Sequence, residues 1–195
     1  MSMNTVPERL AALRAAMAAN GVAVYLIPVG DPHASEYLPC HYTSLTWFSG
    51  FHGENSNFVV TRTETALWAD GRYFVQAEKE IAGTEIKLQR MGEPGVPTVE
   101  EYCANALNEG EALGLCGLTA STALVNGLKK ALEKKGASIK TLNLEDELWP
   151  PCPAGYPSVD PAEGICGLLP GGKAGSAAQQ AQGAGLHRSV CGQAG

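Results

Sequence analysis

The chain has 195 residues, a hydrophobic fraction of 45% and a formal net charge of −6. This length suits one ordinary domain, or one domain followed by a tail. The negative charge argues against a nucleic-acid or anionic-membrane surface, because both need a cationic face, and no apolar run approaches the length of a membrane span.

The first predicted element is an amphipathic helix. Residues 5–8, Thr-Val-Pro-Glu, form a capping box with proline in the first turn, and an apolar face of Leu10, Leu13 and Met17 follows. Gly21 is expected to end this helix. Acidic and basic residues are mixed into the segment, which lacks the apolar core of a signal peptide, so we expect a cytoplasmic protein.

Predicted strands and helices then alternate as far as residue 149. We expect strands over 22–28, 85–91, 111–117 and 138–144, two strands joined by a tight turn over 57–70, and helices over 71–83, 98–110 and 122–136. The last five residues of this region, 145–149, are expected to begin a linker. This order predicts an α/β fold with a mixed sheet and flanking helices.

Composition changes at residue 150. Residues 150–195 hold 10 of the 23 glycines and 6 of the 12 prolines, and they show neither a strand nor a helix periodicity. Such a segment buries too little apolar surface to offset its ordering entropy. We therefore expect one domain over residues 1–149 and a Gly/Pro/Ala-rich tail over 150–195 that is mostly disordered.

The first candidate site is the predicted strand-to-helix corner at residues 68–73. Asp70 can accept hydrogen bonds from the free amides of the helix that follows, Gly71 relieves the corner, and Arg72 can pair with a nearby acid. We favour a helix cap with a buried ion pair. A ligand-facing Arg72 and a catalytic Asp70 are the alternatives.

A second candidate is residues 30–42, which contain Asp31, His33, Glu36, Tyr37 and His41. His33 and Glu36 are three residues apart, so on a helix they could share one face and chelate a metal ion. A hydrogen-bonded loop or a subunit-contact surface is the favoured alternative.

The third candidate is the turn that carries His52 and Glu54. It is rich in Gly and Asn and precedes a predicted strand, so we expect a conformational role, with contact to a substrate as the alternative. No dinucleotide fingerprint, nucleophile elbow or complete phosphate loop occurs in the sequence, and the six cysteines form none of the close pairs that metal knuckles need.

Taken in order, five motifs resemble one family. They are LIPVGDPHASEYLP, WFSGFHGENSNFVVT, ALWADGRYFVQAEKE, LQRMGEPGVPTVEEY and LEDELW. Residues 6–149 are similar to the N-terminal, creatinase-like domain of an Xaa-Pro aminopeptidase (aminopeptidase P), a metallopeptidase family. The resemblance implies a small α/β domain with a mixed sheet of about six strands.

The resemblance also implies where the chemistry lies. The family removes the N-terminal residue preceding proline, using two manganese ions that two Asp, one His and two Glu hold in a C-terminal domain with the pita-bread fold. Those ligands would lie beyond the residues seen here, so this chain is expected to lack that domain, to hold no cofactor and to be inactive on its own. A freestanding binding or dimerisation module of the same fold is the alternative.

Roles for individual residues follow from the same resemblance. The N-terminal domain supports homodimerisation and helps to wall the substrate cleft, which implies no catalytic or metal-binding residue in this chain. The expected substrate-cleft or interface residues are His33, Glu36, Tyr37, His52, Glu54 and Arg72, and the expected structural motif is Trp68, Asp70, Gly71, Arg72 and Tyr73. A weaker interpretation is a small α/β enzyme in which His33, Glu36 and Asp70 converge in one pocket.

The sequence departs from the family pattern in three places. Ser44 and Leu45 stand where many relatives have one or two arginines, and HGENSN replaces Gly-Ser-Ala-Gly after Phe51. Residues 150–195 also lack the family's continuation. Shifting their back-translation by one nucleotide permits a family-like sequence, so we hypothesise that this tail is frameshifted; resequencing the DNA across codon 149 tests that.

Overall fold

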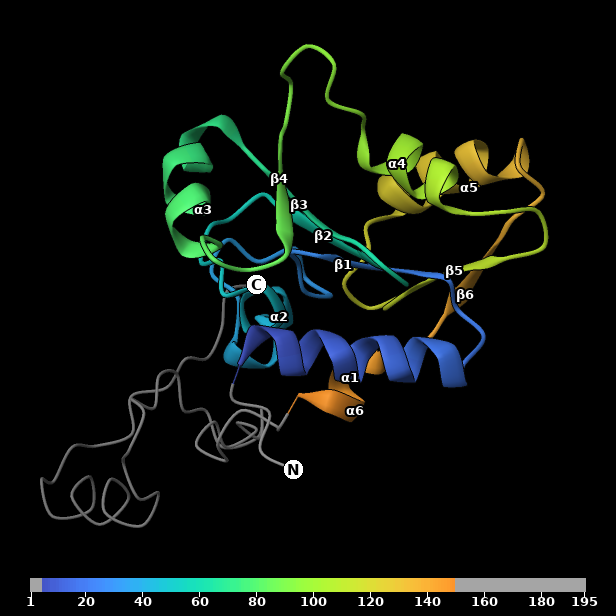
Figure 1. Cartoon of the computed structure of the whole chain (residues 1–195), viewed down its shortest axis with the longest axis horizontal. Helices are drawn as coiled ribbons and strands as arrows, with labels where there is room; N and C mark the ends of the chain where they lie inside the picture. Colours follow the sequence, from blue (N-terminus) through green and yellow to red (C-terminus); the bar gives the residue numbers. More distant parts are fainter. Residues whose placement is uncertain (1–4, 150–195) are drawn as a thin grey trace, which may run out of the picture. The chain divides into compact units, whose positions relative to one another are not determined.

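A six-stranded mixed sheet in the order β4-β3-β2-β1-β5-β6 organises the chain in the computed structural model, which describes residues 5–149 (Figure 1). The strands are β1 Val24–Pro28, β2 Asn57–Thr61, β3 Thr65–Ala69, β4 Ile86–Arg90, β5 Ala112–Leu115 and β6 Ser138–Thr141. The pairs β1/β2 and β2/β3 are antiparallel, whereas β1/β5, β3/β4 and β5/β6 are parallel. The predicted mixed sheet is confirmed.

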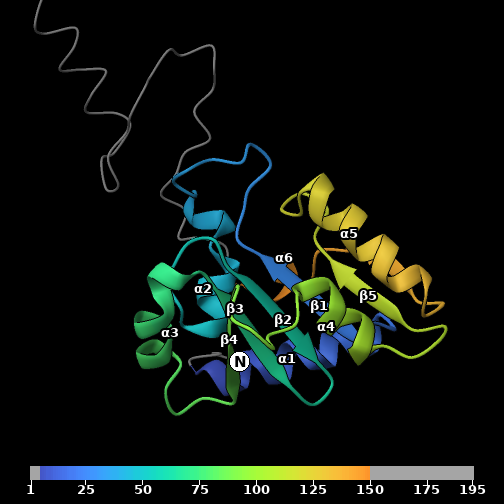
Figure 2. The same ribbon diagram turned by 90° about the horizontal axis from the view of Figure 1, so that it is seen from above.

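Helices cover both faces of the sheet, as Figures 1 and 2 show from two directions. They are α1 Val6–Ala19, α2 Ser44–Ser49, α3 Phe74–Glu80, α4 Val99–Ala106, α5 Thr122–Glu133 and α6 Leu144–Leu148, with short 3-10 turns at Cys40–Tyr42 and Gly71–Tyr73. Side chains from α1, α2, α3 and α6 pack on one face, and those from α4 and α5 pack on the other.

The central strand β1 shows how the sequence builds both layers. Tyr25 and Ile27 point into the core beneath α1, while Val24 and Leu26 point into the core beneath α4 and α5. Successive side chains of a strand alternate between faces, so a strand covered on both sides is apolar along its whole length. This explains why residues 22–28 form an uninterrupted apolar run.

The helix signals act largely as expected. Thr98 and Glu101 form the predicted capping box of α4, and the apolar face of α1 is buried. Gly21 follows α1 with φ +63°, a left-handed conformation that costs glycine little because it has no Cβ. No helix within residues 5–149 is long and apolar enough to cross a membrane.

Two short helices differ from the sequence expectations. Residues 145–149 do not begin a linker: α6 occupies most of them, and its Glu145 is buried against Tyr25 and Ser44. Helix α2 lies in a region where no element was expected. Both helices have five or six residues, too few to show a helical period, and tertiary packing stabilises them. The predictions of a disordered and frameshifted tail concern residues 150–195, which lie outside the described residues.

Candidate functional site

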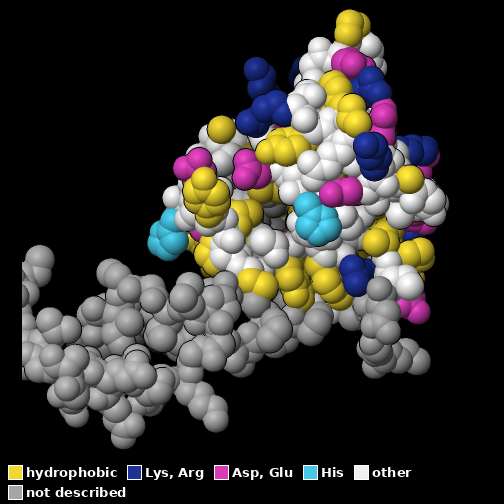
Figure 3. Space-filling model, turned by 90° about the vertical axis from the view of Figure 1, so that its left-hand side faces the viewer, with side chains coloured by type: hydrophobic (Ala, Val, Ile, Leu, Met, Phe, Trp, Pro, Cys, Tyr) yellow, Lys and Arg dark blue, Asp and Glu magenta, His cyan; other side chains and the backbone are white. Residues whose placement is uncertain are grey.

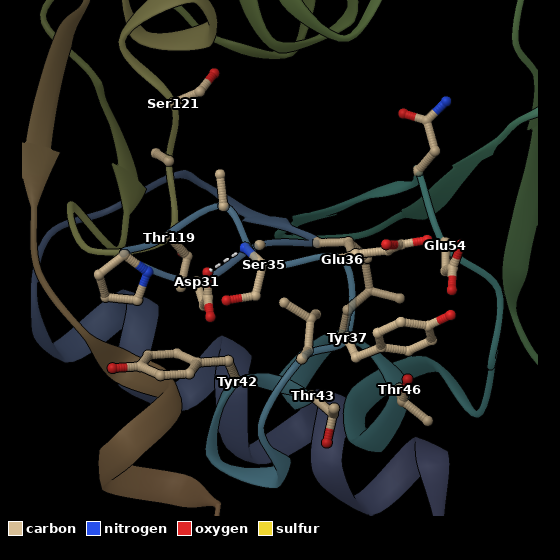
Figure 4. A pocket seen from close by; sticks show the side chains of 18 of the residues that line it. Asp31, Ser35, Glu36, Tyr37, Tyr42, Thr43, Thr46, Glu54, Thr119 and Ser121 are labelled. Atoms are coloured by element: carbon tan, nitrogen blue, oxygen red, sulfur yellow. Dashed lines mark hydrogen bonds between the residues drawn. The ribbon is translucent and has the colours of Figure 1, made fainter. Parts of the chain in front are cut away.

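A cleft of about 870 Å³ lies at one end of the sheet. Five segments line it: the loop after β1, the start of α2, the turn before β2, the 3-10 turn after β3, which contributes Arg72, and the residues that connect β5 to α5. Figure 4 shows side chains of this lining, with Asp31 and Tyr42 on one side and Glu36 and Glu54 on the other. The volume is in the range of small-molecule sites.

The topology explains why a cleft forms there. Strands β1 and β5 are parallel neighbours, so their carboxyl ends meet at the same edge of the sheet. The chain leaves β1 toward β2 and leaves β5 toward β6, which lie on opposite sides of this pair. The two connections diverge and leave a crevice between them. Such a switch point is where open α/β sheets bind ligands.

Five of the six residues expected at a substrate cleft or interface line this one cleft. They are Glu36, Tyr37, His52, Glu54 and Arg72. They come from three segments of the chain, and the fold brings them together. Tyr37 stands out because 80% of its surface is exposed. His33, the sixth residue, is exposed and does not line the cleft.

The helix on which the metal-chelating interpretation of His33 and Glu36 depended is absent. Residues 31–39 form turns and bends instead of a helix, so a spacing of three does not place these side chains on one face. The left-handed conformation of Ala34, with φ +52°, interrupts any helix here. Within residues 5–149, no group of three or more His, Cys, Asp or Glu side chains could hold a metal ion.

Asp31 is the residue of this loop whose importance the sequence analysis missed. Its Oδ1 accepts hydrogen bonds from the backbone N–H of His33 at 3.0 Å and of Ser35 at 2.9 Å. The backbone N–H of Ser35, then the Ser35 side chain, and after them the backbone N–H of His33 lower the pKa of the Asp31 carboxyl. The residue is only 7% exposed, and its Oδ2 has no hydrogen-bond partner in the structure. The Asp-Pro pair, typical of a turn, was the available signal.

Asp70 caps the turn that leads into α3, as predicted. Its Oδ1 accepts from the backbone N–H and from Nε of Arg72, both at 3.0 Å, and its Oδ2 accepts from Asn55 at 2.9 Å. The Arg72 amide, followed by the Arg72 side chain and then Asn55, lowers the pKa of Asp70 to about 2. The prediction that this ion pair is buried is wrong, because the Arg72 side chain is 66% exposed.

The rest of the motif packs against the domain. Trp68 is buried on the α4 side of β3, its indole N–H donates to the Pro97 carbonyl at 2.9 Å, and its ring meets Tyr102 edge-on. Tyr73 is half-buried and meets Phe51 edge-on. Neither Asp70 nor His33 lines the cleft that contains Glu36, so the interpretation as a small enzyme using those three residues is wrong.

The charged side chains of the cleft lining are three carboxylates and one guanidinium, beside His52. Asp31, Glu36 and Glu54 contribute carboxylates, and Arg72 is held by Asp70. The face drawn in Figure 3 mixes hydrophobic side chains with acidic groups, histidines, and Lys and Arg side chains, most of which lie toward its upper part. This chemistry suits binding of a polar or cationic group.

Comparison with known proteins places these features in context. The family model for the creatinase/prolidase N-terminal domain matches residues 9–148. The chain is 39% identical to aminopeptidase P2 of Arabidopsis thaliana over 149 residues, which cover 74% of this chain and 21% of that protein. It is 37% identical to a probable Xaa-Pro aminopeptidase P of Sordaria macrospora over 161 residues, covering 79% of this chain and 26% of that protein.

Solved structures agree. The X-prolyl aminopeptidase of Caenorhabditis elegans, described as a cytosolic enzyme with a dinuclear active site, superposes with a TM-score of 0.68 at 32% identity; the match covers 75% of this chain and 26% of that chain. The N-terminal domain of the cytoplasmic peptidase PepQ from Mycobacterium tuberculosis gives 0.51 at 26% identity, covering 71% and 95%. The chain spans between a fifth and about a quarter of the curated relatives it matches.

Proposed function

Because the chain belongs to the creatinase/prolidase N-terminal domain family, we propose that it acts as the non-catalytic N-terminal domain of an Xaa-Pro aminopeptidase. The observation that carries this proposal is the extent of the match. Residues 9–148 fit the N-terminal domain family, and relatives named as Xaa-Pro aminopeptidases are matched over only 21–26% of their length.

In this proposal, the metal-dependent hydrolysis belongs to a separate C-terminal domain that carries the manganese ions. The residues of the present structure do not fit such a centre, since residues 5–149 offer no group of three or more metal-ligating side chains. The contribution of this chain is architectural. We place it in the cytoplasm, and the descriptions of the nematode enzyme as cytosolic and of the mycobacterial peptidase as cytoplasmic support this.

An activity assay tests the division of labour. The full 195-residue chain is incubated with Mn²⁺ and an Xaa-Pro peptide, with the C. elegans enzyme as the positive control. We expect no release of the N-terminal residue by this chain under conditions in which the control turns over. Turnover above background would contradict the proposal, because hydrolysis would then not need a further domain.

We further propose that the rim of the cleft forms a homodimer contact and, in the assembled enzyme, helps to wall the substrate cleft. Tyr37 and Leu118, 80% and 58% exposed, are large apolar side chains that line the cleft from two different loops. Exposed apolar groups that gather at one place favour a protein–protein contact.

Light scattering coupled to size-exclusion chromatography tests this surface. We expect the unaltered chain to elute as a dimer and the double variant Tyr37→Ser, Leu118→Ser to elute as a monomer. Val75→Ser is the matched control, because Val75 is 66% exposed but lies on α3 and does not line the cleft. A dimer that survives the double change would show that this rim is not the contact.

A further inference from the structure

One oxygen of the Asp31 carboxylate is left without a partner at the cleft. Its Oδ1 already accepts two backbone N–H groups, while Oδ2 accepts none. Figure 4 shows the carboxylate between Ser35 and Tyr42 on the wall of the cleft. A buried, charged oxygen without a donor is costly, and nearly all such groups in folded proteins are paired. The wall of the cleft therefore holds a buried carboxylate oxygen that lacks a hydrogen-bond donor.

We propose that the cleft binds a protonated primary amine, whose ammonium group pairs with Oδ2 of Asp31. The site lies at the switch point between β1 and β5, where the sheet leaves a crevice for a ligand. An ammonium ion would satisfy the unpaired oxygen with a charge-assisted hydrogen bond, which is stronger than a neutral one.

The other groups of the lining also favour a donor ligand. Glu36 and Glu54 add two carboxylates to the cleft. The hydroxyl of Thr43 donates to the Cys40 carbonyl at 2.9 Å, and that of Thr119 donates to the Cys116 carbonyl at 3.4 Å. Since each hydroxyl has a single proton, both oxygens can offer a ligand only lone pairs.

The geometry at Asp31 distinguishes an ammonium from a guanidinium ion. A guanidinium group binds a carboxylate best as a planar fork that uses both oxygens. Here Oδ1 is saturated by His33 and Ser35, which leaves a single oxygen. A compact ammonium, which acts as a point charge with three donors, suits one oxygen better.

Binding can be measured by NMR on the full chain. Increasing amounts of n-propylammonium are added, and the backbone amides of His33 and Ser35 serve as reporters because both donate to Asp31. 1-Propanol is the neutral analogue of the same size, and n-propylguanidinium is the planar cation. We expect saturable shifts of the two amides with n-propylammonium, weaker binding of the guanidinium and none of the alcohol.

Substitution then ties the effect to the carboxylate. Asp31→Asn keeps an oxygen that accepts from His33 and Ser35 but removes the charge, and we expect it to weaken n-propylammonium binding about tenfold or more. Asp146→Asn is the matched control, since Asp146 bonds to Asn143 and does not line the cleft; its affinity should equal that of the unaltered chain.

Three results would overturn the proposal: equal binding of amine and alcohol, tighter binding of the guanidinium, or an unchanged affinity in Asp31→Asn. The first two comparisons use the unaltered chain, so they decide the matter even if the variant fails to fold. Amine binding at Asp31 does not require that the chain docks against a catalytic domain, and the peptidase assay reports on that assignment separately.

Discussion

Glu145 makes the stability of this domain dependent on pH. It is 4% exposed; its Oε1 lies 3.2 Å from the Tyr25 hydroxyl, and its Oε2 accepts from Ser44 at 3.2 Å. The Tyr25 oxygen also accepts from the Leu144 amide and lies 3.2 Å from the Leu142 carbonyl. Tyr25 has one proton for two acceptors. A protonated Glu145 can donate to Tyr25, which is then free to donate to Leu142, so every group is satisfied.

The size of the effect follows from the pKa. Burial raises the pKa of Glu145 from 4.5 to about 7, and the charge of Asp146 adds to this, while the bonds from Ser44 and Tyr25 oppose it. Well below pH 4.5 the group is protonated in both states. Above that value the unfolded chain loses the proton first, so stability falls as pH rises and levels off above about 7. At about 1.4 kcal/mol per pKa unit, the total loss is about 3 kcal/mol.

Urea unfolding of the full chain between pH 5 and 8.5 measures this, with Glu145→Gln as the comparison. Gln is a neutral isostere that can donate to Tyr25 and accept from Ser44. We expect the variant to be more stable by about 1 kcal/mol at pH 5 and by about 3 kcal/mol at pH 8. Taking the difference between the two chains removes the contribution of every group that titrates alike in both. A difference that does not change with pH would refute this account of Glu145.

Three further predictions concern the motif and its surroundings, all measured by urea unfolding. Gly53→Ala should destabilise the domain by about 1–3 kcal/mol, because a Cβ there would lie 2.1 Å from Cζ of the buried Phe51 ring; an unchanged midpoint would contradict this. Trp68→Phe should cost about 2 kcal/mol, since it leaves a void and an unpaired Pro97 carbonyl, whereas Val75→Ala on the surface should cost little. The lowered pKa of Asp70 stabilises the folded state above pH 3.8, and this stabilisation is lost as the pH falls toward 2. Asp70→Asn should therefore make the free energy of unfolding fall less between pH 3.8 and pH 2. An equal fall in the variant and the unaltered chain would show that the Asp70 cap is not responsible.

The sheet and the long helices could be predicted because their signals are local. The apolar run of β1, the capping box of α4 and the face of α1 each need only a few neighbouring residues to be recognised. The resemblance to the family likewise rested on short motifs of neighbouring residues. Trp68 is buried and Asp70 caps a turn, so both are constrained by packing and backbone geometry, whatever the chemistry of the whole protein.

The cleft and α6 could not be predicted in the same way, because they depend on contacts between distant segments. Glu145 is separated from Ser44 by 101 residues and from Tyr25 by 120, and nothing near it in sequence marks it as buried. In isolation, the segment is short and acidic and suggests an exposed linker. Its burial is decided by the polar partners that β1 and α2 provide.

Asp31 and Asp70 show why residue type alone does not identify a functional carboxylate. Each follows a strand, and each accepts the backbone N–H of the residue two positions later at 3.0 Å. The two residues differ at Oδ2. The Oδ2 of Asp70 accepts a hydrogen bond from Asn55, whereas the Oδ2 of Asp31 has no partner, and Asp31 lines the cleft. A saturated carboxylate stabilises its own turn, and an unsaturated one can still bind something else. The stretch around Asp70 was the first candidate site in the sequence, whereas the carboxylate oxygen without a partner is that of Asp31.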